Sequence, residues 1–408
     1  MFYTEVVNKS VKPSFFVDTR NKEKQGTFLY TAQTKRFVSS LGHSCYDVLP
    51  ITKKGIAEFS STYFGCPSKR LTLIGVTGTN GKTSTVFYLK QSLEALGKKV
   101  LSIGTLSHQL TTPGSWDLQQ LFFDHLESGG THVVMEVSSH GIDQCRVLDL
   151  DFNVTLLTNI SQDHLDYHHS MKAYEATKLG FMQSGGGQAI YPEDFKNIEL
   201  PFSNKTKFQT LNLQAVKATL LALGFSVNKV DACLKTLSDP PGRFEIIQKE
   251  PFEVVVDYAH SPDGLQAVLK EAKQSLGASK GRLICLFGCG GDRDKSKRPI
   301  MGQYAELFSD LVVVTSDNPR SESMAAIADD ILAGMKDPNL AYVELDRKKA
   351  IAYAFQVARK NDLVLIAGKG HETYQLIGED RLDFDDRSIA KDLLRVSNVQ
   401  KESNKGLA

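Results

Sequence analysis

The sequence predicts an α/β protein with three domains: a small mixed α/β domain, a central domain built on a parallel sheet, and a C-terminal Rossmann-like domain. Three observations lead to this prediction. The 408 residues suffice for two to four domains with buried cores. Short apolar runs alternate with helical patterns from about residue 71, and again after residue 242. The segment before them is mixed and weakly patterned, so we expect domains at 1–68, 69–239 and 240–408.

The central segment has the pattern of successive βαβ units. Its apolar runs LTLIGVTG, KKVLSIGTL, HVVMEVSS and VTLLTNIS predict strands, and a helical pattern from Lys82 to about Leu96 follows the first of them. Strands that are buried on both faces are apolar throughout rather than alternating, and parallel strands need crossover helices. We therefore expect a parallel sheet here.

The C-terminal segment repeats this pattern with different sequences. The runs FEVVVDYAH, RLICLFGCGG, LVVVTSDNPR and DLVLIAGKG predict strands, with helical stretches such as 262–276 and 324–335 between them. Asp239-Pro240-Pro241-Gly242 precedes the set and has the composition of an interdomain linker. A second parallel sheet is the expected result.

A glycine-rich loop follows the first central strand and opens the first helix. Glycines let backbone N–H groups approach phosphate oxygens, a lysine can bridge the terminal phosphates, and a hydroxyl can bind Mg²⁺. Val76 takes the place of the first glycine of the usual pattern. The loop nevertheless predicts a P-loop ATPase-type domain that binds a nucleoside triphosphate. Its residues are Gly78, Thr79, Asn80, Gly81, Lys82, Thr83 and Ser84.

Polar side chains follow the next central strands. Glu136 ends the run HVVME, and its position favours a metal ligand over a solvated carboxylate, since parallel sheets present site residues at strand ends. His164 lies in a polar cluster after the next apolar run. Lys178 lies between apolar neighbours on a predicted helix, and the pattern alone favours a surface lysine.

Four polar or glycine-rich loops end the C-terminal strands, and together they predict one site on the rim of that sheet. Each loop could be an ordinary turn. Arg293 and Arg320 suit bidentate recognition of a carboxylate, while Asp317 and Glu372 suit an ammonium group. The composition fits a zwitterionic amino acid.

Composition excludes several other classes of protein. The 48 Lys and Arg nearly balance the 47 Asp and Glu, so the net charge of +1 gives no field for nucleic acid. No apolar run is long enough for a membrane span, and the N-terminus lacks the pattern of a signal peptide. Six cysteines without paired spacing indicate reduced thiols. We expect a cytoplasmic monomer that acts on small molecules, with neither nucleic acid nor membrane as a partner.

Ten motifs in order resemble those of the Mur ligases, and within that family the MurE type. They are GVTGTNGKTST, MEVSSHG, TNISQDHLD, YEATK, TLNLQAVKA, PGRFE, VVDYAHSPDG, GCGGDRDKSKRP, TSDNPR and GKGHETYQ. The resemblance runs from about residue 56 to about residue 386. It implies ATP-dependent amide-bond formation through an acyl phosphate, in peptidoglycan precursor synthesis.

The resemblance also implies roles for residues on the ATP side. Lys82 and Thr83 would handle the phosphates and a first Mg²⁺ together with Glu136. His164 would bind a second Mg²⁺, supported by Lys178, which resembles a lysine that is carbamylated in the family. Adenine and ribose would contact Asn212, Asp257 and His260.

Substrate roles follow in the same way. Residues that match muramoyl-peptide positions are Thr111, Thr112, Ser138, Gln144 and Arg146. Residues that match positions for the incoming amino acid are Arg293, Asp317, Asn318, Arg320, Gly368 and Glu372. The DNPR form resembles ligases that add meso-diaminopimelate, here to UDP-N-acetylmuramoyl-L-Ala-D-Glu, because its arginine can hold a distal carboxylate that lysine lacks.

Two departures from the family keep other readings open. Asp18-Thr19-Arg20 resembles the opening of the family's uridine-binding segment, but the loop that usually follows is missing, and the stretch from Lys178 to Pro240 is short. One alternative is therefore a related ATP-dependent amide ligase with a different, non-UDP acceptor. Another is a nucleotide-binding scaffold without chemistry, which the intact Lys82, Glu136, His164 and Lys178 disfavour.

Overall fold

The computed structural model describes residues 51–405, apart from residues 109, 185, 204 and 278–279, and three short strands before them. The side chains of residue 166 and of residues 396–405 lie outside the description. The chain divides into two compact units, of which the second comprises 161–167, 204–210 and 238–408. The N-terminal strands β1 (Phe15–Phe16), β2 (Gly26–Tyr30) and β3 (Tyr46–Pro50) form a small parallel sheet. Asp18-Thr19-Arg20 lies outside the described residues, and the division at 68 stays a prediction.

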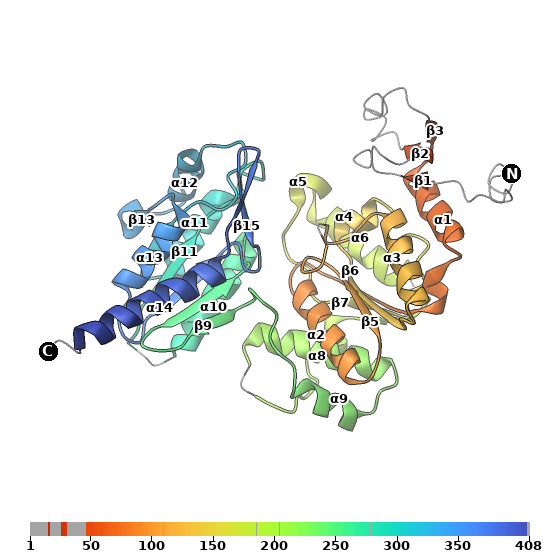
Figure 1. Cartoon of the computed structure of the whole chain (residues 1–408), viewed down its shortest axis with the longest axis horizontal. Helices are drawn as coiled ribbons and strands as arrows, with labels where there is room; N and C mark the ends of the chain where they lie inside the picture. The colour runs from red at the N-terminus through yellow and green to blue at the C-terminus, as the bar shows by residue number, and fades with distance from the viewer. Residues whose placement is uncertain are drawn as a thin grey trace. The chain divides into compact units, whose positions relative to one another are not determined.

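A five-stranded sheet forms the centre of the first unit (Figure 1). Its order is β5-β6-β4-β7-β8, and every neighbouring pair is parallel. The strands are β4 (Thr72–Thr77), β5 (Val100–Ile103), β6 (His132–Glu136), β7 (Val154–Leu157) and β8 (Gln188–Ile190). Because β6 and β7 flank β4, the loops that follow these three strands meet at one edge of the sheet.

Helices cover both faces of this sheet. Side chains of α2 (Lys82–Ala95), α8 (Lys207–Ala222) and α9 (Val227–Leu234) pack on one face, and those of α3 (Ser115–Glu127) and α6 (Met171–Ser184) on the other. The remaining helices of this part of the chain are α1 (Lys53–Tyr63), η2 (Pro67–Arg70), α4 (Ser139–Asp143), α5 (Leu165–His168) and α7 (Pro192–Phe195). The two covered faces explain why β6 and β7 are buried along their whole length.

The second unit has a six-stranded sheet of order β13-β12-β11-β14-β10-β9. All pairs are parallel except β9 with β10. The strands are β9 (Glu245–Gln248), β10 (Glu253–Asp257), β11 (Leu283–Phe287), β12 (Leu311–Val314), β13 (Ala341–Val343) and β14 (Leu363–Ala367). The α/β class predicted from the two alternating segments is thus confirmed.

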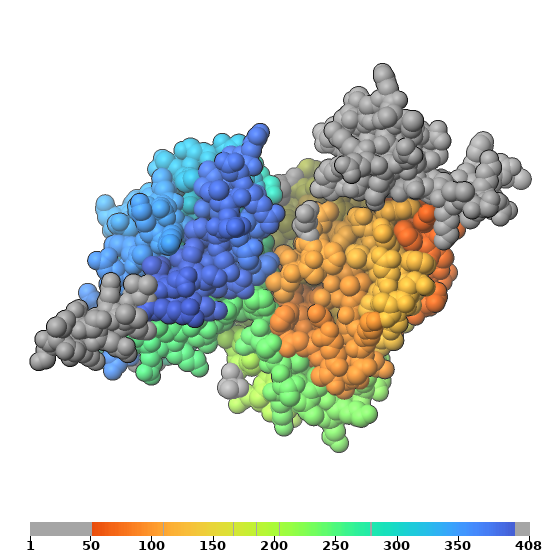
Figure 2. Space-filling view, viewed as in Figure 1, coloured from red at the N-terminus to blue at the C-terminus, as the bar shows by residue number. Residues whose placement is uncertain are grey.

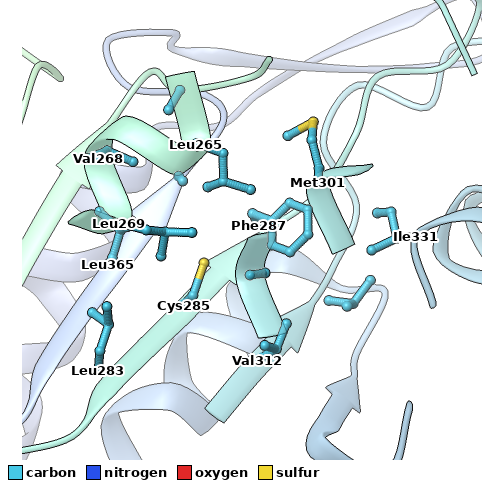
Figure 3. Packing of buried hydrophobic residues seen from close by; sticks show 14 of the residues in the cluster. Leu265, Val268, Leu269, Leu283, Cys285, Phe287, Met301, Val312, Ile331 and Leu365 are labelled. Carbon is cyan, nitrogen blue, oxygen red and sulfur yellow. The ribbon is translucent and has the colours of Figure 1, made fainter. Parts of the chain in front are cut away.

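The core of the second unit also lies on both faces of its sheet. Helices α10 (Pro262–Leu276), α11 (Lys297–Phe308) and α12 (Met324–Leu332) cover one face, where Figure 3 shows Leu365 and Phe287 packed among their side chains. Helices α13 (Arg347–Val357) and α14 (Asp386–Lys405) cover the other, and η3 (Pro338–Leu340) precedes β13. A hairpin of β15 (Tyr374–Ile377) and β16 (Asp380–Asp383) lies at the surface of this unit, in dark blue in Figure 2.

The structure bears on two expectations from composition, which concern membrane-spanning helices and the state of the cysteines. None of the helices in the described part of the chain combines the length and apolar character that a membrane span requires. The five cysteines among the described side chains are free thiols. Burial raises the pKa of Cys285 and of Cys289 to about 12, so neither forms a thiolate near neutral pH.

A leucine pair tests the core of the second unit. Leu365 is fully buried in β14, whereas Leu307 on α11 is 65% exposed. Leu365→Ala should lower the free energy of unfolding by about 2–5 kcal/mol, because it removes buried methyl groups and leaves a cavity. Leu307→Ala should change it by no more than about 0.5 kcal/mol. Urea unfolding followed by far-ultraviolet circular dichroism measures the free energy of unfolding of both variants. Equal losses in the two variants would contradict the described packing.

Candidate active site

Two glycines allow the loop after β4 to take its shape. Gly78 has φ 145° and Gly81 has φ 84°, a region that side chains disfavour. A Cβ on Gly78 would lie 1.9 Å from Thr158 Oγ1, and one on Gly81 would lie 2.5 Å from Asn212 Oδ1. The loop is therefore closely surrounded, and Asn212 of α8 lies beside it.

The segment after β7 holds the loop in place. Thr79 N–H donates to the carbonyl of Asn159 (2.9 Å), and Asn80 N–H donates to Asn159 Oδ1 (3.0 Å). The Thr158 hydroxyl donates to the carbonyl of Asn80 (2.6 Å). Helix α2 then begins at Lys82, and its N-cap Gly81 supplies no side-chain hydrogen bond, so the first N–H groups and the dipole of the helix can face an anion. The geometry suits a phosphate group.

Two lysine side chains converge on the carbonyl oxygen of Gly78. Lys82 Nζ donates to it at 2.9 Å and also to the carbonyl of Thr79 at 2.9 Å. Lys178 Nζ donates to the same oxygen at 2.9 Å. Lys178 is 1% exposed and lies over the ring of Tyr174, whose hydroxyl is 3.0 Å from Thr79 Oγ1. The surface position that the pattern alone favoured for Lys178 is wrong.

Glu136 lies next to the start of α2. Its Oε2 accepts from the Thr83 hydroxyl (3.0 Å), and its Oε1 accepts from Thr105 N–H (2.8 Å). A Cβ on Gly104 would lie 2.2 Å from Glu136 Oε1, so the Glu136 side chain packs closely against the backbone here. A hydroxyl beside a carboxylate is an oxygen donor set of the kind that Mg²⁺ prefers. Thr83 and Glu136 therefore fit one magnesium ion.

His164 belongs to the second unit, where it lines a polar cavity. His164 is exposed with φ 53°, its Nε2 lies 3.5 Å from Asp163 Oδ2, and its segment 161–167 groups with the second unit. Within the described residues, no cluster of three or more His, Cys, Asp and Glu could hold a metal. A second magnesium position at His164 and Lys178 stays a prediction.

The residues matched to the muramoyl peptide form one connected group around α4. Thr112 Oγ1 accepts from Ser138 N–H and donates to the carbonyl of Glu136, both at 3.0 Å. Arg146 donates to the carbonyl of Thr112 (2.6 Å) and to Gln144 Oε1 (2.5 Å). Thr111 Oγ1 lies 3.2 Å from Thr105 Oγ1, which ties the group to Glu136. The sequence reasoning did not identify Thr105, because its partner Glu136 lies 31 residues further along the chain.

The loops after four strands of the second unit line one cavity of about 490 Å³. Because β12, β11, β14 and β10 are successive neighbours, their carboxyl ends share one rim. The lining residues from these loops are Tyr258, His260, Gly290, Arg293, Asp294, Asp317, Asn318, Arg320, Gly368 and Glu372. Asp257 does not line the cavity; its carboxylate accepts the N–H groups of Phe244 (2.7 Å) and Ala259 (2.8 Å).

The two predicted arginines differ in how firmly they are held. Arg293 is exposed and donates to the carbonyl of Asp292 (3.0 Å). Arg320 has φ 52°, and the β15–β16 hairpin fixes its backbone through its N–H to Leu376 O (3.0 Å) and its carbonyl from Gly378 N–H (2.7 Å). The guanidinium of Arg320 donates to Gly291 O at 2.8 Å. Arg320 is thus the more rigid of the two.

Buried ion pairs that the sequence reasoning did not identify support these loops. Arg347 and Asp386 are both fully buried and 2.8 Å apart, and Arg347 also donates to the carbonyls of Ser316 (3.2 Å) and Ala367 (2.9 Å). It therefore joins the ends of β12 and β14. Fully buried Arg298 pairs with Glu322 at 2.9 Å, and this hydrogen bond lowers the pKa of Glu322 to about 2. Charged side chains in a helix give no sequence signal for such pairs.

Comparison with known proteins agrees with this arrangement. The Mur ligase middle domain matches residues 76–230, and the Mur ligase, glutamate ligase domain matches residues 242–370. The UDP-N-acetylmuramoyl-L-alanyl-D-glutamate–2,6-diaminopimelate ligase of Solibacter usitatus is 39% identical over 403 residues, covering 84% of this chain and 81% of its own. Such a ligase from Clostridium acetobutylicum is 35% identical, covering 93% and 94%.

Solved structures give the same result. A structure of a ligase with that name superposes with a TM-score of 0.59 at 27% identity, covering 97% of this chain and 99% of its own. MurF ligase from Thermotoga maritima in complex with ADP has a TM-score of 0.61 at 16% identity, which shows a shared fold.

A phosphate loop beside a magnesium-type carboxylate, with a second α/β unit that carries a polar cavity, defines an ATP-dependent ligase. The chain belongs to the Mur ligase family. The resemblance found in its motifs is thereby confirmed.

A glycine pair tests the phosphate loop. Gly78→Ala should abolish measurable ATP binding in calorimetry, because its Cβ would collide with Thr158 and displace the loop. Gly97→Ala is the matched control: Gly97 also has a positive φ of 77°, but a Cβ there meets nothing within 4 Å. It should lower stability by about 1 kcal/mol and leave ATP affinity unchanged. ATP binding by the Gly78 variant with native affinity would contradict the close packing of this loop.

Proposed function

We propose that this ligase adds meso-diaminopimelate to UDP-N-acetylmuramoyl-L-Ala-D-Glu at the expense of ATP. The observation that carries the proposal is the grouping of Arg320 with Asn318 and Glu372 around one cavity of the second unit. A diamino diacid carries a carboxylate and an ammonium group at the end remote from the new bond, which these side chains can pair. Relatives at 35–39% identity bear the name of that activity.

The chemistry divides between phosphoryl transfer and amide formation. The acceptor carboxylate attacks the γ-phosphorus of ATP, the bond to the β–γ bridging oxygen breaks, and ADP leaves with that oxygen. The amine of the incoming amino acid then attacks the acyl carbon, phosphate leaves, and the amine gives up a proton. Lys82 and the N-terminus of α2 neutralise charge on the transferred group. Mg²⁺ held by Thr83 and Glu136 would add further positive charge there.

The acceptor would bind near the connected group that contains Thr112 and Arg146. That group shares Glu136 and Thr105 with the magnesium position, so an acceptor carboxylate held there would lie near the phosphate loop. Asn212, Asp257 and His260 are proposed to contact the adenine and ribose of ATP. Ser84, Gly368 and the other matched residues are proposed to have the roles that the motif resemblance implies. The enzyme is further proposed to act as a monomer in the cytoplasm.

Lys178 is proposed to be carbamylated. The ammonium group would first give up a proton, and addition of CO₂ to the neutral amine with loss of a second proton would give a carbamate anion that could support a second Mg²⁺ together with His164. The burial of Lys178 beside the phosphate loop, with its Nζ 2.9 Å from the carbonyl oxygen of Gly78, supports this role.

The activity assay uses ADP release with defined pairs of substrates. UDP-N-acetylmuramoyl-L-Ala-D-Glu with meso-diaminopimelate should release ADP and form the amide. ADP release only with an acceptor that lacks UDP would establish the alternative amide ligase. No ADP release with any acceptor, despite ATP binding, would leave a nucleotide-binding scaffold as the correct reading.

Arg320 tests how the amino acid is recognised. Arg320→Lys should raise KM for meso-diaminopimelate by about 10- to 100-fold, because an ammonium cannot replace a bidentate guanidinium. KM for ATP and for the acceptor should stay within about threefold of the parent. Steady-state kinetics with each substrate varied in turn measures the three values, and an unchanged KM for the amino acid would exclude Arg320 from recognition.

Lys178 tests the carbamate. Lys178→Ala should lower kcat by about 100-fold or more, because the anion beside the second Mg²⁺ is lost. A short-chain carboxylate such as formate or acetate should restore part of the rate by taking its place. Chloride at equal ionic strength is the control, and full activity of the variant without any addition would refute the carbamate.

A further inference from the structure

Lys369 is a fully buried lysine at the centre of the amino-acid loops. Its Nζ lies 3.1 Å from Asn318 Oδ1, 3.1 Å from Glu372 Oε2 and 3.9 Å from Asp317 Oδ1. It is absent from the lining of the cavity, whereas all three partners line it. A buried ammonium is stable only when the protein pairs it. The charge of Lys369 therefore acts on its three neighbours rather than on a ligand directly.

Lys369 fixes the orientation of the Asn318 amide. Asn318 Oδ1 accepts from Lys369 Nζ and also from Leu376 N–H at 3.0 Å, so both donors identify this atom as the oxygen. Asn318 Nδ2 must then point the other way, and it donates to Glu372 Oε2 at 3.0 Å. A flipped amide would set Nδ2 against two donors.

The same network leaves one oxygen of Glu372 available. Glu372 Oε2 accepts from both Asn318 and Lys369, while Oε1 accepts no hydrogen bond from any residue that the structure describes. Asp317 and Glu372 bring two negative charges and Lys369 brings one positive charge. Within this group of three charged residues, one negative charge is left over, and Glu372 Oε1 remains as an acceptor.

Other charged and polar side chains lie around this network. Arg320 and Tyr374 line the cavity, as do the charged residues Arg293, Lys297, Asp294 and Asp263. Arg347 interacts electrostatically with Asp317 and Glu372, and Tyr258 packs against His371. Arg347 is already neutralised by Asp386. The guanidinium of Arg320 faces the carbonyl of Gly291 and is left for an anionic group.

We propose that Lys369 is a positioning residue that sets amino-acid selectivity. Lys369 donates a hydrogen bond to Glu372 Oε2 and neutralises one of the two carboxylate charges. The site is then left with one acceptor for a ligand that carries a single ammonium group at the end remote from the new bond. This inference rests on the proposed function, since it assumes that the cavity takes a diamino diacid. It assigns Lys369 no contact with the substrate.

The test compares two amino acids on three enzymes. Meso-diaminopimelate has the second ammonium group, and 2-aminopimelate has the same length and both carboxylates without it. The parent should prefer meso-diaminopimelate by about 100-fold in kcat/KM, the size expected when a buried polar group is left unpaired. Lys369→Gln should raise KM for meso-diaminopimelate by about tenfold or more, change kcat little, and reduce the preference to below about tenfold. Lys369→Arg keeps the charge and should retain most of the preference.

Lys217→Gln is the matched control for loss of a buried lysine. Lys217 is 7% exposed on α8 and pairs with Asp231 at 2.5 Å, outside the cavity lining. It should lower thermal stability and leave both the preference and KM for the amino acid unchanged. KM for ATP should be native in all variants.

Each outcome decides the inference. A Lys369→Gln enzyme that keeps the parent's preference, or that binds meso-diaminopimelate more tightly, overturns it. If Lys369→Arg loses as much of the preference as Lys369→Gln does, the positive charge is not what sets selectivity, and the inference fails. Lys369→Met replaces Lys369→Gln if the latter does not fold; if neither folds while Lys217→Gln does, Lys369 is a folding residue and the inference fails. A parent enzyme that does not use meso-diaminopimelate refutes the proposed function instead.

Discussion

The carbonyl oxygen of Gly78 is the atom on which the first unit's site depends. Two ammonium groups, from Lys82 and Lys178, donate to it from different helices. Gly78 itself has φ 145°, and a Cβ at this position would collide with Thr158. The oxygen thus places one cation for the phosphates and buries a second beside them. The segment after β7 holds the rest of the loop through hydrogen bonds from Asn80 to Asn159 and from Thr158 to Asn80.

Both units build their sites at the carboxyl ends of neighbouring parallel strands. In the first, β6 and β7 flank β4, which brings Glu136 and Asn159 to the phosphate loop although they lie far along the chain. In the second, four neighbouring strands deliver four polar loops to one cavity. Backbone hydrogen bonds of the sheet fix these strand ends, and buried pairs such as Arg347–Asp386 fix the loops beyond them. Rigid loops of this kind limit how far a bound group can shift during phosphoryl or acyl transfer.

Much of this arrangement could be predicted from the chain. The phosphate loop, the strand-end position of Glu136 and the four polar loops of the second sheet all follow from runs of adjacent residues. Lys178 could not be placed by pattern, since its helix has few features that separate a buried lysine from an exposed one, and the motif resemblance was needed. Thr105, Tyr174 and Lys369 escaped notice because each acts through a contact with a residue distant in sequence. Lys369 stood in a quoted motif, yet no local feature shows that its ammonium is fully buried.

The sequence by itself determined the class of each unit, the order of its strands along the chain and the chemistry that each loop carries. These are local properties, because apolar runs, glycine conformations and side-chain types do not depend on distant partners. Only the tertiary structure decided which strands are neighbours, which carboxylate oxygen is occupied and which charges are buried. Those properties depend on sheet order and on packing between segments that lie far apart in the chain, such as Lys178 and Gly78, which are 100 residues apart. The proposed selectivity at Glu372 belongs to this second group, because it would depend on Lys369, whose burial only the tertiary structure shows.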